Sequence, residues 1–406
     1  MMKKNSKKNF IWNTLGSLVN SFTSLFFMII VTRINGTDIA GIFTFAFSMA
    51  CLFQVIANYA GRVYQVTEIS DDIGDSDFLF HKIATCVIMV LFVLVFILFK
   101  NYSLEKNVVI LLLVLFRLIE SFVEVIYAII QKNNELYKVG ISLFLKGIIG
   151  TILFFIVDYF TKSIINSIIA LIVVNLVVSI FFDFRWVKPF YKKNSFNKDK
   201  VIKLFKGGFF VCCFTFLTQY ILNAPKYAID DLMSNDAQTV YGIISMVATI
   251  LILCSQFIVQ PLLVRIAEMI KDKKYSDLKH MTYKILIILV IIGCLGEIGC
   301  YLLGIPFLEL VYGVPLMKYR LPLMLIVLGA MFFALSFIIS TILTSLRSTF
   351  VQIVFYVITS VFIFFLSKYL VNLNGILGAS ISYAISMFLL FLMYFIYYIR
   401  KDDVNG

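Results

Sequence analysis

Apolar stretches of about 20 residues recur along the whole chain and are separated by short polar segments. An α-helix needs this length to cross about 30 Å of hydrocarbon, because it rises about 1.5 Å per residue. The pattern predicts about 12 spans, at 10–32, 38–60, 81–99, 107–130, 138–157, 164–184, 207–229, 240–264, 282–304, 321–346, 349–371 and 374–397. We therefore expect an all-α polytopic membrane protein.

The two halves of this pattern resemble each other. The stretch "DIAGIFTFAFSM" begins at Asp38 and "DAQTVYGIISM" begins at Asp236, and each opens the second span of its half. The segments that follow those spans, "TEISDDIGDSD" (67–77) and "AEMIKDKKYSD" (267–277), match as well. Agreement in both order and offset favours a duplication. It predicts two six-helix bundles related by a pseudo-twofold axis along the membrane normal.

A basic segment joins the two predicted bundles. We expect an N-terminal six-helix bundle at 1–184, a basic cytoplasmic linker at 185–206 and a C-terminal six-helix bundle at 207–406. No predicted loop exceeds about 22 residues, so no segment outside the membrane is long enough to fold as an enzyme domain.

Composition agrees with this class, and the charge distribution orients the chain. Of all residues, 61% are hydrophobic and only 14% are charged, which is too few polar groups to cover a soluble surface. A β-barrel would show alternating segments instead. About 25 of the 35 Lys and Arg residues fall on the side of the two termini, and the positive-inside rule makes that side cytoplasmic. The net charge of +12 is then a cytoplasmic rim, and no nucleic-acid partner is needed.

The sequence contains no pattern typical of a catalytic, nucleotide or metal site. Its seven cysteines all lie in apolar runs, without a CxxC pair or a Cys/His cluster. It also has no Gly-rich phosphate loop and no Walker motif. We therefore expect no catalytic residues, no cofactor and no metal ion.

Polar side chains form a stripe on the first span of each predicted bundle. Both stripes recur at helical spacing, and their members are Asn13, Ser17, Asn20 and Ser24 in one span and Thr215, Gln219, Asn223 and Lys226 in the other. Such a stripe lines either a helix–helix seam or a wet cavity, and for the first stripe alone the two interpretations are even. Its recurrence on both first helices favours a shared cavity.

Lys226 follows Pro225 near the end of its span, close to Asp230 and Asp231. Two interpretations stand: a helix edge at the water boundary, or a functional cation on the polar face. Pro225 removes a backbone donor and frees the carbonyl one turn back, which a cavity-lining helix tolerates. We expect a bent helix end whose lysine faces the cavity.

Charged side chains lie inside two neighbouring spans. Arg117, Glu120 and Glu124 share one face of span 107–130, and Lys146 lies at a similar depth in the next span. The first interpretation is a self-neutralising network, in which Arg117 pairs with Glu120 and Glu124 pairs with Lys146. The second, equally weighted, is a site for substrate or a coupling ion.

Three further ionisable residues lie in or at the ends of spans. Glu297 lies between Gly296 and Gly299 without a partner in its own helix; protonation would suit a coupling carboxylate, and a place near the outer boundary is the favoured alternative. Arg33 ends the first span but faces away from its polar stripe. Arg62, at the inner end of the second span, could meet an anionic headgroup or reach lipid phosphate.

Several stretches resemble one family of transporters: "KNFIWNTLGSLVNSFTSLFFMIIVTRINGTDIAGIFTFAFS", "GRVYQVTE", "NAPKYAIDDLMSNDAQTVYGIIS" and "GIPFLELVYG". They are similar to bacterial polysaccharide flippases, the O-antigen and teichoic-acid type transporters of the multidrug/oligosaccharidyl-lipid/polysaccharide exporter superfamily. The similarity covers essentially the whole chain. It implies transport of an oligosaccharide or teichoic-acid precursor on undecaprenyl diphosphate, from the cytoplasmic to the outer leaflet of the bacterial cell membrane. It also implies alternating access through a cationic cavity between two bundles. Some members have additional helices, which are absent from the roughly 12 spans predicted for this chain.

A diphosphate headgroup needs cations and hydrogen-bond donors. The candidate substrate-binding residues are therefore Lys226, Asn223, Gln219, Arg33, Arg62, Asn13, Asn20, Arg117 and Lys146, with Lys226 ranked above Arg33. The candidates for a coupling ion, Na⁺ or H⁺, are Glu120, Glu124 and Glu297. We expect a monomer whose partners are the lipid-diphosphate-linked glycan and membrane lipids.

The alternative function is a multidrug-type cation antiporter on the same fold, which would favour an acidic pocket. A membrane glycan polymerase or ligase would need a large outer loop, which the sequence lacks.

Overall fold

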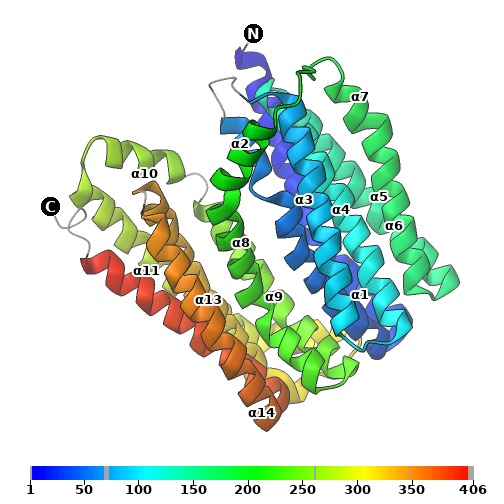
Figure 1. The fold of residues 1–406 in the computed structure, drawn as a ribbon. Helices are drawn as coiled ribbons and strands as arrows, with labels where there is room; N and C mark the ends of the chain where they lie inside the picture. The colour runs from blue at the N-terminus through cyan, green and yellow to red at the C-terminus, as the bar shows by residue number, and fades with distance from the viewer. Residues whose placement is uncertain (1, 68–72, 260–261, 347, 401–406) are drawn as a thin grey trace. The chain divides into compact units, whose positions relative to one another are not determined.

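The computed structural model describes residues 2–67, 73–259, 262–346 and 348–400, and each element in these ranges is helical (Figure 1). The chain forms two compact units, Met1–Phe216 and Leu217–Gly406. Residues 68–72, which fall within the repeat segment 67–77, lie outside the described ranges. The predicted all-α polytopic class is confirmed. The predicted bundle and linker boundaries stay predictions.

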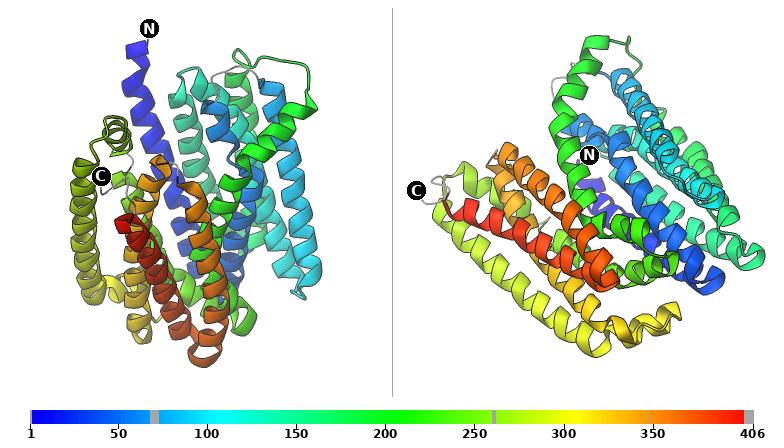
Figure 2. Two further views of the ribbon diagram at one scale, coloured as in Figure 1. Left: turned by 60° about the vertical axis from the view of Figure 1, so that its left-hand side comes forward. Right: turned by 60° about the horizontal axis from the view of Figure 1, so that its bottom comes forward.

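The first unit is built from helices that pack side by side (Figure 2). They are α1 (Met2–Asn58), α2 (Gly61–Thr67), α3 (Asp75–Phe99), α4 (Leu104–Lys132), α5 (Leu136–Thr161) and α6 (Ile164–Val178), which continues through the π-helical turn η1 (Ser179–Asp183) into α7 (Phe184–Val187). A loop at 188–197 leads to α8 (Lys198–Leu232), whose first half belongs to this unit and whose second half belongs to the next.

The second unit repeats this all-helical plan. After α8 it contains α9 (Asn235–Val259), α10 (Leu262–Lys271), α11 (Tyr275–Gly299), the π-helical turn η2 (Cys300–Gly304), α12 (Ile305–Tyr312), the 3₁₀ turn η3 (Met317–Tyr319), α13 (Arg320–Ser345) and α14 (Thr349–Arg400). Its main contacts join α13 to α14, α9 and α11.

Two of the helices reverse direction at a single glycine. Gly36 inside α1 has φ +86°, and Gly375 inside α14 has φ +55°, values that glycine adopts without the steric cost of a Cβ. Thr44 Oγ1 donates to Met28 Sδ at 3.0 Å, so the two halves of α1 lie antiparallel about Gly36. The ring contacts of Tyr394 with Phe355 and Tyr356 fold α14 back in the same way.

Nine helices of the described ranges are long and apolar enough to cross a membrane. This number is below the predicted count of about 12 for a physical reason. Helices α1 and α14 each contain two predicted spans on either side of their glycine. Helix α4 carries Arg117, Glu120 and Glu124 within its length, so its composition is less apolar than that of its neighbours.

Glycines allow α1 and α5 to approach closely. A Cβ at Gly16 would overlap the carbonyl oxygen of Gly140, and a Cβ at Gly140 would overlap the Trp12 carbonyl. Small residues let helix backbones touch inside a membrane, where no hydrophobic effect drives association. Asn13 and Asn20 lie half-buried beside this seam. Part of the predicted polar stripe therefore borders a packing interface.

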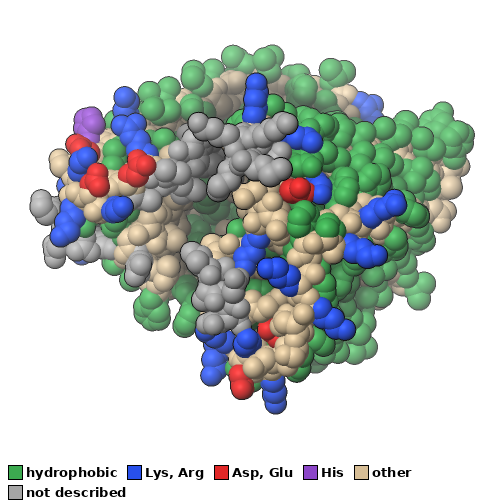
Figure 3. Space-filling view, turned by 90° about the horizontal axis from the view of Figure 1, so that it is seen from above, with side chains coloured by type: hydrophobic (Ala, Val, Ile, Leu, Met, Phe, Trp, Pro, Cys, Tyr) green, Lys and Arg blue, Asp and Glu red, His purple; other side chains and the backbone are tan. Residues whose placement is uncertain are grey.

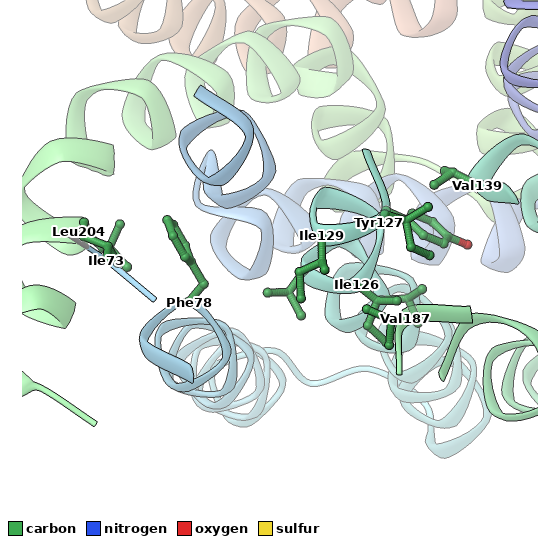
Figure 4. Close-up of a cluster of buried hydrophobic side chains, with 11 residues drawn as sticks. Ile73, Phe78, Ile126, Tyr127, Ile129, Val139, Val187 and Leu204 are labelled. Carbon is green, nitrogen blue, oxygen red and sulfur yellow. The ribbon is translucent and has the colours of Figure 1, made fainter. Parts of the chain in front are cut away.

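An apolar cluster ties the beginning of α8 to the first unit (Figure 4). It draws on α3, α4, α5, α7 and α8, and its buried members are Ile73, Phe78, Val123, Val125, Ile126, Tyr127, Ile129, Ile130, Val139, Val187 and Leu204. The Tyr59 hydroxyl adds a hydrogen bond of 3.2 Å to the Phe205 carbonyl. The predicted linker 185–206 is thus packed on the first unit.

Candidate functional site

The ionisable residues predicted inside the membrane come together in the first unit. Helix α4 aligns Arg117, Glu120 and Glu124 along one face, as their spacing of three and four residues requires. Each of the three has a charged partner within hydrogen-bonding distance. The partners come from α4 itself and from α2, which packs against it.

Arg62, the second residue of α2, forms an accessible ion pair. Its Nη1 lies 3.0 Å from Glu124 Oε2, and its Nε and Nη2 donate to Gln131 Oε1 at 3.1 and 3.0 Å. The Arg62 and Glu124 side chains are 26% and 28% exposed. A guanidinium carries five donors. Arg62 therefore has donors beyond those these contacts use, and a further anion can bind it.

Arg117 forms the second pair, and this pair confirms the predicted one. Its Nη1 lies 2.6 Å from Glu120 Oε2, and its Nη2 donates to Cys51 Sγ at 3.3 Å. The guanidinium also lies 4.6 Å from the centre of the Phe47 ring, a favourable cation–π distance. Gln54 Nε2 lies 3.5 Å from the same Glu120 oxygen. This pair is less exposed than the Arg62 pair.

Lys146 forms the third pair, and its partner differs from the predicted one. Its Nζ lies 2.6 Å from Asp183 Oδ2, with exposures of 5% and 0%. The hydroxyl of Tyr127 accepts from the same amino group at 2.9 Å and lies 3.0 Å from Ser142 Oγ. The predicted pairing of Lys146 with Glu124 is wrong, because α6 and η1 run back along α5 and supply the carboxylate, whereas Glu124 faces α2.

The sequence does not single out Asp183 as the partner of Lys146, because Asp183 lies at the very end of a predicted span. Acidic residues are common at such positions. The π-helical turn η1 ends at this residue. Such a turn inserts a residue into the helical register and re-aims the side chain that follows. The Tyr127 ring separates the two clusters: the Arg62 guanidinium lies 5.6 Å from its centre and the Lys146 amino group 5.3 Å.

Lys82 of α3 is a second residue that the sequence did not single out. Its buried Nζ donates to the carbonyls of Ala57 and Asn58 at 2.8 and 3.3 Å, which satisfies the last carbonyls of α1. The next two residues have positive φ, 43° at Tyr59 and 56° at Ala60. Lys82 thus helps to fix where α1 ends and where α2, with Arg62, begins.

In the second unit, three residues of the predicted polar face of α8 form a hydrogen-bonded run, while Thr215 lies in the first unit and donates to the Val211 carbonyl. Lys226 Nζ donates to Asn223 Oδ1 at 3.2 Å, and Asn223 Nδ2 donates to the Gln219 carbonyl at 3.0 Å. Helix α8 continues past Pro225 to Leu232. Lys226 is half-buried. Asp231, one turn further, pairs with Lys368 of α14 at 3.4 Å.

The remaining candidates lie apart from these clusters. Arg33 is exposed at the end of the first half of α1. Glu297 is half-buried in α11, and its Oε2 has no hydrogen-bond partner among the described residues. The geometry thus separates the predicted cations of these clusters into three kinds. Arg62 and Arg117 form partly exposed pairs with carboxylates of α4, and Lys226 is half-buried in the second unit. Lys146 is enclosed with its own counter-ion.

Comparisons with known proteins identify the family of the chain and proteins that share its fold. A sequence model of the family described as "Polysaccharide biosynthesis protein" matches residues 6–266. The capsular polysaccharide biosynthesis protein CapF of Staphylococcus aureus is 23% identical over 400 residues, which cover 97% of this chain and 99% of CapF.

Solved structures with a similar fold are transporters. A multidrug resistance MATE family transporter of the MOP superfamily, in its inward-facing conformation, matches with a TM-score of 0.73 at 11% identity, covering 98% of this chain and 99% of that one. The D35N mutant of the Vibrio cholerae MATE transporter VcmN matches with a TM-score of 0.66 at 12% identity, covering 100% and 99%. At such low identity the likeness concerns the fold.

Proposed function

The chain belongs to the polysaccharide biosynthesis protein family, and we propose that it is the flippase of a lipid-linked glycan. Family and fold are those of membrane transporters, not of enzymes. The proposed substrate is an oligosaccharide or teichoic-acid precursor on undecaprenyl diphosphate. It moves from the cytoplasmic to the outer leaflet of the bacterial cell membrane, and the protein acts as a monomer with both termini in the cytoplasm.

The accessible pair of Arg62 and Glu124 is the observation that carries this proposal. Arginine binds phosphate oxygens through two parallel hydrogen bonds, so a partly exposed arginine at the inner end of a span suits a diphosphate headgroup. In the proposed mechanism, the diphosphate of the substrate takes the place of the Glu124 carboxylate on Arg62. Arg117 supplies a second cation in the same unit, and Lys226 is a separate candidate cation of the second unit.

The displaced carboxylate offers a route for coupling. Once Arg62 binds phosphate, Glu124 is a partly exposed carboxylate without its counter-ion, which favours uptake of H⁺ or Na⁺. When the glycan leaves, Arg62 pairs with Glu124 again and the ion is released, so the bound ion stabilises the substrate-bound state. Glu120, in its pair with Arg117, can take part in the same way, and Glu297 is a separate candidate in the second unit.

A multidrug-type cation antiporter is the alternative function, and the fold likeness to multidrug transporters favours it. A cationic substrate requires a carboxylate that no basic residue neutralises. In the charged cluster of the first unit, Glu120, Glu124 and Asp183 each have a cationic partner. These pairs leave no un-neutralised carboxylate in that cluster for a cationic substrate, and the polysaccharide family membership favours an anionic one.

Deletion of the gene tests the proposal in cells. Without the flippase, the labelled lipid-linked precursor accumulates in the cytoplasmic leaflet, and a plasmid copy of the wild-type gene restores its export. The amount in each leaflet is read with a membrane-impermeant reagent that modifies only the outer pool. An unchanged leaflet distribution in the deleted strain would falsify the flippase proposal.

A further inference from the structure

The loop between α7 and α8 is built onto the beginning of α3. Asp77, in the first turn of α3, is completely buried. Its carboxylate accepts hydrogen bonds from Gly74 N at 3.1 Å, from Asn194 Nδ2 at 3.1 Å and from Asn197 N at 3.0 Å. Two of these three donors belong to the loop 188–197. A buried carboxylate therefore holds the loop in place.

Further hydrogen bonds join the loop to the beginning of α3. We call this set of hydrogen bonds between Asp75, Ser76 and Asp77 of α3 and the loop residues Tyr191, Lys192, Asn194 and Asn197 the clasp. Asn194 accepts from Ser76 N at 2.9 Å through Oδ1 and donates from its backbone N to Ser76 Oγ at 3.1 Å. The same Oγ lies 3.1 Å from the Tyr191 hydroxyl, and Lys192 N donates to Asp75 Oδ2 at 2.9 Å. A loop held at several points is more than a spacer. It presents its outward side chains in fixed positions.

Those outward side chains are aromatic and basic. Phe196 is 53% exposed and contacts the exposed Phe80 of α3, with ring centres 4.5 Å apart. Lys192, Lys193 and Lys198 are exposed on the same loop and at the start of α8. We call these five residues the α3–α8 platform. An exposed aromatic pair among lysines is unfavourable in water but suits the boundary between headgroups and acyl chains.

The surroundings of the platform are those of a membrane interface. It lies at the end of the first unit that carries the amino terminus (Figure 1), and Lys and Arg side chains gather on the face seen from that end (Figure 3). Trp186, just before the loop, packs edge-on to Phe182 at 5.3 Å. Tryptophan is enriched at the level of the headgroups.

We propose that the α3–α8 platform binds anionic phospholipid headgroups of the cytoplasmic leaflet. The three lysines attract the phosphates, and Phe80 and Phe196 enter the acyl boundary below them. Asp77 is the positioning residue, because its hydrogen bonds set the course of the loop. The binding surface is independent of the transported glycan, and the proposed topology enters only in naming the leaflet.

A single-tryptophan reporter tests this surface in the full-length protein. The chain has two tryptophans, so Trp12→Phe, Trp186→Phe and Phe196→Trp together leave one, placed on the platform. The protein is reconstituted in phosphatidylcholine vesicles containing either brominated phosphatidylglycerol or brominated phosphatidylcholine, because bromine quenches a tryptophan that it contacts. We expect each of the three lysines to raise the preference for phosphatidylglycerol over phosphatidylcholine by about fivefold, so that the brominated anionic lipid quenches more strongly. Equal quenching by the two lipids would overturn the proposal.

Matched variants locate the effect. In the reporter background, the triple change Lys192→Gln, Lys193→Gln and Lys198→Gln removes the preference. The control Lys271→Gln, Lys273→Gln and Lys274→Gln removes the same charge from exposed positions of the second unit and preserves the preference. A control that weakens the preference as much as the platform variant would overturn the proposal, because attraction by the whole basic face would then suffice.

The clasp has its own test. Asp77→Asn keeps every lysine of the platform but removes the charge that orders the loop, and it lowers the preference for the anionic lipid. Because this buried change can also disturb folding, the variant is compared with the wild type by size-exclusion profile and helical circular dichroism. A variant with native profile and spectrum and an undiminished preference would rule out the positioning role of Asp77.

Discussion

Arg62 and Lys146 are both basic residues within one bundle, but their surroundings give them different tasks. Lys146 is enclosed with Asp183 and hydrogen-bonded to Tyr127, so its charge is fully committed inside the unit. Arg62 is partly exposed, and its carboxylate partner is exposed to a similar degree. The first arrangement holds helices together, whereas the second can exchange one anion for another.

Replacing Lys146 by Ala is expected to destabilise the protein without a specific effect on substrate binding. The change leaves the Asp183 carboxylate buried without its counter-ion, which costs about 3–5 kcal/mol. The apparent Tm in detergent should fall by on the order of 10 °C. The double variant Lys146→Met with Asp183→Leu should recover most of the loss. A single variant as stable as the wild type would contradict this assignment.

Replacing Arg62 by Ala is expected to impair transport while the protein still folds. The substrate phosphate loses charge-assisted hydrogen bonds of about 1.5–3 kcal/mol, so the initial flipping rate at low substrate should fall by at least about tenfold. Arg62→Lys keeps the positive charge but loses the planar guanidinium that makes two parallel hydrogen bonds. Its flipping rate should therefore lie between the rates of the wild type and Arg62→Ala. The initial rate in vesicles and the apparent Tm are measured on the same preparations. If the rate falls only to the extent that the variant loses thermal stability, a role of Arg62 in binding is refuted.

Replacing Lys226 by Ala is expected to impair transport while the protein still inserts. Lys226 heads the hydrogen-bonded run of Asn223 and Gln219 in α8 and supplies the proposed cation of the second unit. The matched control is Lys368→Ala, which removes a lysine of the same unit from the exposed pair with Asp231. Export of the glycan in complemented cells is the readout. Normal export with Lys226→Ala would show that this lysine only reaches toward the interface.

Some residues of the site could be predicted from the sequence, and others could not. The pair of Arg117 and Glu120 lies within one helix, so a spacing of three residues predicts it. The partners of Lys146 and Glu124 depend on how far neighbouring helices slide past each other. Asp183 reaches Lys146 only after a π-helical turn at the end of α6. The spacing of residues along the sequence indicates neither the axial offset between neighbouring helices nor the π-helical turn.

At the scale of the element, the glycines of α1 and α5 set how closely these helices approach. The sequence predicts the helices themselves, because runs of apolar residues and the length of a span determine them. It does not show which polar stripe borders a seam. Asn13 and Asn20 lie beside the Gly16–Gly140 contact, so for this stripe the packing interpretation holds at least in part.

Replacing Gly16 by Leu is expected to separate α1 from α5 and to destabilise the first unit. A side chain at this position meets the backbone of Gly140, which cannot move aside as a flexible side chain can. A loss of about 1–3 kcal/mol is expected from the overpacking. The control is Gly299→Leu in α11, where a Cβ meets no atom within 4 Å. Thermal unfolding in detergent compares the two, and equal stabilities would contradict the close approach.

At the scale of the whole molecule, the two units share a helical plan but differ in their interior chemistry. The described part of the first unit contains the ion pairs Arg62–Glu124, Arg117–Glu120 and Lys146–Asp183. In the second unit, a buried cluster joins the neutral groups Gln352, Ser340 and Tyr394. The duplication inferred from the sequence predicts such a common plan and stays a prediction. The asymmetry places most of the proposed phosphate-binding charge in the first unit, which the internal repeat of the sequence did not reveal.

Flipping of a labelled undecaprenyl-diphosphate oligosaccharide by the purified protein in vesicles shows whether the protein is a flippase. A membrane-impermeant reagent reports the fraction of substrate that reaches the outer leaflet. We expect faster transfer than in empty vesicles. Arg62→Ala should be close to the empty-vesicle rate, and Lys162→Ala, at an exposed lysine at the end of α5, should be like the wild type. Transfer equal to that of empty vesicles, or an Arg62→Ala variant as fast as the wild type, would contradict it.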